Sequence, residues 1–222
     1  MLNLQMIEKL CSLGSPSIMA TLDAAKADQT TLALSERHKA ELLHMLGIKN
    51  GFYAFESALH VFPLVSEHLI DNQDLIHWNL PSTWKEAYVE GTSDLFCFAE
   101  DIFGYQFSCR QDRIVRFDPE TGDVEDLCGT VEEWAALICQ DFNLQTGYPI
   151  AHKWQAAKGP IQPGNRLVPV YPFVSSQGTY ELTNLYEINA VKGMLSRADF
   201  ARQIKTIPDG TQVKIVPKNL AS

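Results

Sequence analysis

Ten carboxylates crowd one stretch of the sequence, residues 98–134, which reads FAEDIFGYQFSCRQDRIVRFDPETGDVEDLCGTVEEW. Side chains of this type can ligate a metal ion, act as an acid–base pair, or form a charged surface that recognises another molecule. The sequence around them has to decide between these three roles. The ten are Glu100, Asp101, Asp112, Asp118, Glu120, Asp123, Glu125, Asp126, Glu132 and Glu133.

The known spacings for metal and phosphate chemistry do not occur. A calcium loop of the EF-hand type needs glycine at its sixth position and glutamate at its twelfth, but DPETGD has glycine fifth and proline second. The six histidines form no HxH, HxxxH or HExxH pattern, and GxxxxGK, GxGxxG and GxSxG are also absent. We therefore predict no metal, no cofactor and no catalytic residue. Two facing carboxylates could still serve a hydrolase, although nothing selects a pair.

The charge is distributed unevenly along the 222 residues, whose net charge is −9. Residues 1–150 hold 9 Lys and Arg against 23 Asp and Glu, whereas residues 151–222 hold 9 against 4. The segment 86–141 alone carries −11. Such a field repels nucleic acid and steers basic partners toward it, although simple solubility would explain it equally well.

Composition indicates a folded protein of the cytoplasm. Apolar residues make up 45% of the chain, enough for a buried core, and no apolar run reaches membrane-spanning length. The first residues, MLNLQMIEKLCSLGSPS, lack the features of a signal peptide. Five cysteines with wide spacing and no CxxC pair are typical of reduced, buried thiols.

The chain predicts helices first and strands afterwards. Apolar spacing and breakers indicate helices over 6–14, 16–29 and 35–47, the last one capped by Ser35. The aromatic segment 51–64 favours strand or irregular core structure, and Pro81 could begin a helix that places Trp84 and Tyr88 on one face.

The clearest local pattern is a β-hairpin. Ile114, Val115 and Phe117 lead into DPETG, where proline and glycine suit a tight turn, and Val124 leads out again. Thr130 and Glu133 then predict a capping box at the start of a helix over 130–142. We expect seven residues to form core and hairpin: Phe98, Phe103, Gly104, Phe107, Ile114, Val115 and Phe117.

Two parts of the chain are predicted, residues 1–158 and an extension over 159–222. A further helix should end near Gly159. Prolines at 160, 163, 169 and 172 then favour an extended crossing of the surface. A helix over 197–204, a turn at 208–210 and a short strand at 212–216 should complete the extension, which we expect to pack on the first part.

The order of several motifs resembles the SUKH superfamily. The matching pieces run from Gly51 to Phe142 and comprise Trp78-Asn79, PxxWxxxY, FAEDIFGYQF, the DPETG hairpin and the glutamate-rich helix containing Trp134. The later segments PGNRLVPVYPFV and NLYEINAVKGM are similar to an extension in a bacterial subgroup found near Rhs-type and type VI secretion toxins. Superfamily members include regulators of cell-wall synthesis and bacterial immunity proteins.

The resemblance implies an α+β fold, a mixed twisted β-sheet with hairpins flanked by helices. It implies no catalysis: most bacterial members bind a cognate toxin domain and neutralise it. Because many such toxins are nucleases with basic clefts, an acidic surface could act as a phosphate mimic. The predicted partner-binding residues are the acids flanking the core of residues 98–134: Glu100, Asp101, Asp118, Glu120, Asp123, Glu125 and Asp126.

Two other functions remain open from sequence. A SUKH-like adaptor would dock other cytosolic proteins without being an inhibitor. A hydrolase would use two of the carboxylates and would lose turnover when a single one is neutralised. The leading hypothesis is a cytoplasmic immunity protein whose partner is a cognate toxin domain, with no direct contact to nucleic acid or membrane.

Overall fold

A six-stranded sheet forms the centre of the protein in a computed structural model that describes residues 3–20, 34–64, 73–88 and 90–207. The strands follow one another in space as they do in sequence, and every pairing between them is antiparallel, including that of β2 with β3, which a long connection joins. The predicted α+β class is confirmed, with an antiparallel sheet where a mixed one was expected. The strands are β1 (Phe52–Ala54), β2 (Leu59–Val61), β3 (Phe96–Asp101), β4 (Gln106–Arg110), β5 (Arg113–Phe117) and β6 (Val124–Cys128).

The hairpin of β5 and β6 has the turn that its sequence predicts. The side chain of Asp118 accepts hydrogen bonds from the backbone N–H groups of Glu120, at 2.7 Å, and Thr121, at 3.4 Å. Gly122 has a φ of +72°, in the left-handed region that favours glycine. The register pairs Arg116 with Glu125, which fixes which acids lie on β6.

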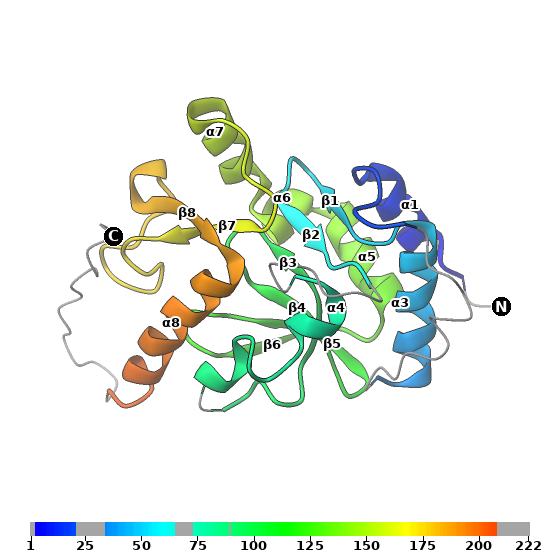
Figure 1. Ribbon diagram of the computed structural model, residues 1–222, viewed down its shortest axis with the longest axis horizontal. Helices are drawn as coiled ribbons and strands as arrows, with labels where there is room; N and C mark the ends of the chain where they lie inside the picture. The colour runs from blue at the N-terminus through cyan, green and yellow to red at the C-terminus, as the bar shows by residue number, and fades with distance from the viewer. Residues whose placement is uncertain (1–2, 21–33, 65–72, 89, 208–222) are drawn as a thin grey trace.

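Three helices cover one face of the sheet, α1 (Gln5–Leu13), α3 (Glu36–Ile48) and α5 (Val131–Gln140) (Figure 1). The ring of Trp134 packs edge-on against Phe98, with centroids 4.8 Å apart. Buried Glu41 of α3 accepts the backbone N–H of Val131, and Glu132 of α5 accepts those of the first residues of α1. Carboxylates thus accept backbone N–H groups at the N-termini of two helices.

The predicted caps of these helices are confirmed, with one change. Ser35 accepts from His38 N, and Thr130 accepts from Glu133 N. The Glu133 carboxylate reaches Gly129 N rather than closing the capping box on Thr130. The helix predicted over 16–29 has no helical turn in residues 16–20, and its remainder lies outside the described residues.

The opposite face of the sheet packs on α4 (Leu75–Trp78), the 3₁₀ turn η1 (Lys85–Ala87) and α8 (Ala190–Ile204). Trp78 and Met194 both contact the side chain of Gln106 on β4. The residues that follow Pro81 form a turn and then the single 3₁₀ turn η1 rather than the predicted α-helix. A hydrogen bond from Lys85 Nζ to Leu95 O holds the chain in this turn. Trp84 and Tyr88 still meet, edge to face, with centroids 5.7 Å apart.

The C-terminal part of the described chain, from Phe142 onward, packs on the central sheet. It comprises α6 (Phe142–Thr146), α7 (Tyr148–Lys158), β7 (Asn165–Pro169), η2 (Leu182–Asn184), β8 (Leu185–Asn189) and α8, with β7 and β8 forming a separate two-stranded sheet. The predicted surface crossing is wrong for β7, whose Arg166, Leu167 and Val168 are buried. Pro169 is tolerated because it ends the strand.

The last helix is longer than the sequence indicated. α8 begins at Ala190 rather than 197, capped by the side chain of Asn189, and its Met194 and Ala198 join the same core as the central sheet. The turn predicted at 208–210 and the strand at 212–216 lie outside the described residues. The boundary between 158 and 159 stays a prediction.

Candidate protein-binding surface

The seven acids predicted to bind a partner divide into two groups. Glu100, Asp101 and Glu120 are buried, with 0%, 6% and 1% of their surface exposed, so their assignment to an exposed surface is wrong. Asp118 is half-buried and serves the turn. The remaining three, Asp123, Glu125 and Asp126, are exposed on the β5–β6 hairpin, where the sequence placed them.

Glu100 is buried because the chain supplies a cation for it. Its Oε1 lies 2.9 Å from Nε of Arg166 and 3.2 Å from Nδ1 of His60, and Gln106 donates to Oε2. Burial alone would raise the pKa of Glu100, but Arg166, with His60 and Gln106, offsets this and holds the pKa below its ordinary value. Glu100 is therefore an ionised structural group.

Asp101 holds the tight connection between β3 and β4. Its Oδ1 accepts the backbone N–H groups of Phe103, at 2.8 Å, and Tyr105, at 2.9 Å. Burial nevertheless raises the pKa of Asp101 to about 7. Gly104 in this connection has a φ of +78°, and a Cβ there would lie 2.7 Å from Nη2 of Arg197, so both conformation and space require glycine.

Glu120 is the third buried acid, and it lies beneath the segment that precedes η2. Its Oε2 accepts from Val174 N at 3.3 Å, whereas Oε1 has no hydrogen-bond partner among the described residues. Burial raises the pKa of Glu120, against the effect of nearby Arg197. The sequence predicted Glu120 to lie in an exposed turn, because the segment around Val174 that covers it comes more than fifty residues later in the chain.

The exposed acids of β6 are paired with arginines of β5. Arg116 Nη2 lies 2.6 Å from Oε2 of Glu125, and Arg113 Nε lies 3.8 Å from Oδ2 of Asp126. Exposed pairs of this kind contribute little to stability and are open to exchange with other cations. Asp123 precedes the strand at the end of the turn. Acidic charge thus lies along the last strand of the sheet.

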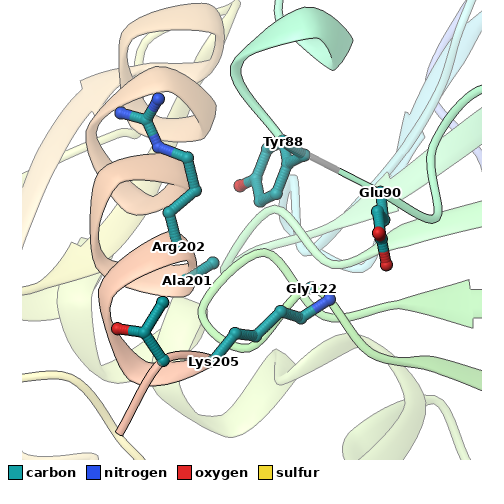
Figure 2. Close-up of a pocket in the computed structure, with 7 residues that line it drawn as sticks. Tyr88, Glu90, Gly122, Ala201, Arg202 and Lys205 are labelled. Atoms are coloured by element: carbon teal, nitrogen blue, oxygen red, sulfur yellow. The ribbon is translucent and has the colours of Figure 1, made fainter.

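A cavity of about 200 Å³ opens beside the same turn (Figure 2). The ring of Tyr88 and the methyl of Ala201 are apolar parts of its wall, Glu90 lies on one side, and Lys205 reaches toward Gly122 from α8. Sequence reasoning placed Tyr88 in the core and did not indicate a cavity, because the lining residues come from three separate parts of the chain. The lining residues are Tyr88, Glu90, Gly122, Ala201, Arg202, Lys205 and Thr206.

The surroundings of the cysteine thiols and of the other possible metal ligands show no reactive or metal-binding site among the described residues. All five cysteines are free, and burial raises the pKa of each, which keeps the thiol protonated. Within the described ranges, no group of three His, Cys, Asp or Glu side chains could hold a metal ion. No helix in this part of the chain is long and apolar enough to cross a lipid bilayer.

The fold and this hairpin define an α+β protein with a six-stranded antiparallel meander and an acidic last strand. No protein-family model matches the chain, and no curated protein matches it either. A solved structure is similar, the crystal structure of Atu4351 from Agrobacterium tumefaciens, with 14% identity, a TM-score of 0.53 and coverage of 86% of each chain. At this identity the likeness concerns the fold alone, and the SUKH resemblance stays a prediction.

Proposed function

We propose that this protein is a cytoplasmic immunity protein that binds a cognate toxin domain and neutralises it without catalysis. The observation that carries the proposal is the row of exposed carboxylates on the turn and last strand of the sheet, Asp123, Glu125 and Asp126. The resemblance in sequence to SUKH immunity proteins points to the same function. A basic toxin cleft is the complementary partner.

The mechanism is electrostatic capture followed by exclusion of the toxin's own substrate. The acids attract a basic surface during encounter. The carboxylates of Glu125 and Asp126 then contact the partner's cations in addition to, or in exchange for, Arg116 and Arg113. Once bound, the carboxylates occupy the positions that phosphates take in a nuclease cleft. The cavity beside Tyr88 lies at the same end of the hairpin and offers room for an anchoring side chain of the toxin.

Contacts within the fold account for two of the three buried acids without a hydrolytic role. Glu100 is held in an ion pair, and Asp101 accepts two backbone N–H groups of its own turn. The ion pair and the hydrogen bonds give both carboxylates a structural role. No contact of the described residues specifically favours the adaptor alternative.

The test is co-expression with the protein encoded by the adjacent gene, scored by growth rescue and co-purification. We expect rescue and a stable complex with the natural sequence, and loss of both in a variant carrying Glu125→Lys with Asp126→Lys. The matched control reverses the same charge on exposed acids of α1 and α3, Glu8→Lys with Glu36→Lys. Equal rescue by all three proteins would exclude the acidic hairpin as the binding surface.

A further inference from the structure

Among the described residues, no strand pairs with the outer edge of β6. β6 is the last strand of the sheet in the described part of the chain, with β5 on its inner side. Asp118 N donates to Asp123 O at 2.9 Å, so the alternation of an antiparallel ladder makes Arg116 and Glu125 the next hydrogen-bonded pair. The backbone N–H and C=O groups of Val124 and Asp126 therefore point away from β5.

The side chains on this edge select what can pair with it. Successive strand residues point to opposite faces, so Glu125 places a carboxylate on one face and Asp126 places one on the other. Each carboxylate already has an arginine of β5 on its inner side and solvent on its outer side. A second copy of the same edge would bring like charges together, which is unfavourable. A strand with basic residues at successive positions is complementary on both faces.

We infer that the toxin domain adds a basic β-strand to the outer edge of β6 and extends the sheet. This inference rests on the proposed function and specifies how the partner is held. Backbone hydrogen bonds to Val124 and Asp126 supply affinity, and Lys or Arg side chains opposite Glu125 and Asp126 supply specificity. The end of β6 nearest the turn lies beside the cavity at Tyr88. A partner strand paired with β6 would therefore place its adjoining residues at the opening of that cavity.

Amide hydrogen exchange of the full chain, alone and in complex with the adjacent gene's product, tests the inference directly. In the free protein the Glu125 amide should already be protected by β5, whereas those of Val124 and Asp126 should exchange quickly. Complex formation should slow exchange at Val124 and Asp126 at least tenfold. A stable complex without this protection overturns strand addition and leaves the proposed function intact, whereas absence of any complex removes both.

Two substitutions at position 126 distinguish the contribution of the backbone hydrogen bond from that of the side-chain charge. Asp126→Pro removes the outward N–H together with the carboxylate, and proline is tolerated on a sheet edge. Asp126→Ala removes the carboxylate alone. We expect Asp126→Pro to weaken the complex about tenfold more than Asp126→Ala, as loss of one backbone hydrogen bond predicts. Equal Kd values, or protection of the Val124 and Asp126 amides in the free protein, would show that no partner strand uses this edge.

Discussion

Nε of Arg166 lies 2.9 Å from Oε1 of Glu100, and neither side chain is exposed to solvent. The pair joins β7 of the C-terminal segment to β3 of the central sheet, across 66 positions of sequence. Arg166 also lies over the ring of Tyr53, 5.7 Å from its centroid. Three distant parts of the chain therefore depend on one buried cation.

Removing that cation should destabilise the protein strongly. Arg166→Met leaves Glu100 buried and without its main counter-charge, and we expect a loss of about 3–5 kcal/mol in the free energy of unfolding. Urea denaturation followed by circular dichroism measures it. The double variant Arg166→Met with Glu100→Gln should recover part of the loss, because no charge is left buried. A single variant as stable as the natural protein would show that the pair is dispensable.

Stability should depend on pH through Asp101. Its pKa is raised from 3.8 to about 7 on folding, so the folded protein keeps a proton that the unfolded chain has lost. This contribution is fully present below pH 4 and disappears as the pH rises through 7. Asp101→Asn keeps the acceptor oxygen and should flatten the fall in stability over this range. Glu100 has the opposite effect on stability. Because folding lowers its pKa, its contribution is lost as the pH falls.

The connection between β3 and β4 should not tolerate a side chain at position 104. Gly104→Ala forces a left-handed conformation on alanine, at about 1–2 kcal/mol, and also pushes Cβ against Arg197. Gly91→Ala is the control, because Gly91 has a φ of +85° and an added Cβ would lie 3.7 Å from Gly122 O, an ordinary van der Waals contact. The melting temperature should fall further for Gly104→Ala, and equal falls would mean that Arg197 simply moves away.

Association with the toxin should weaken as salt is added. Exposed carboxylates act through a field that ions screen within about 8–10 Å at physiological strength. The association rate, measured by stopped flow, should drop steeply between 50 and 500 mM salt, in the range of about tenfold or more. The Glu125→Lys, Asp126→Lys variant should associate slowly at every salt concentration. A salt-independent rate for the natural protein would contradict electrostatic capture.

Local features were readable from sequence, and distant pairings were not. The β5–β6 hairpin depends on a turn whose proline, glycine and aspartate lie within six residues, and the Thr130 cap depends on the residue three positions later. The seven expected core residues of 98–117 lie inside as predicted. Glu100 was placed on the surface because a charged residue is rarely buried unless it is paired.

The partner of Glu100 could not be found in the sequence because Arg166 lies in a segment whose prolines suggested a surface path. The short apolar run Leu167-Val168 is the one signal that could have indicated a strand there, although a run of this length does not distinguish a strand from other buried structure. The exposure of Asp123, Glu125 and Asp126 could be predicted without knowledge of distant contacts, because the local register of the β5–β6 hairpin determines where they lie. Three of the seven predicted residues are exposed as expected, and their binding to a partner stays a prediction, whereas the expected exposure is wrong for the three acids that later segments cover.

The late contacts of the central sheet have a consequence for synthesis on the ribosome. Strands β1 to β6 emerge before Arg166 and before α8, whose Met194 carbonyl accepts the hydroxyl of Tyr88. Until those residues leave the exit tunnel, α4 and η1 cover the second face of the nascent sheet only in part, and Glu100 lacks its counter-charge. The hairpin can form early, but a rigid platform for it exists only once translation has passed α8. Newly made chains should therefore depend on chaperones until α8 has emerged, and resist proteases only after that point.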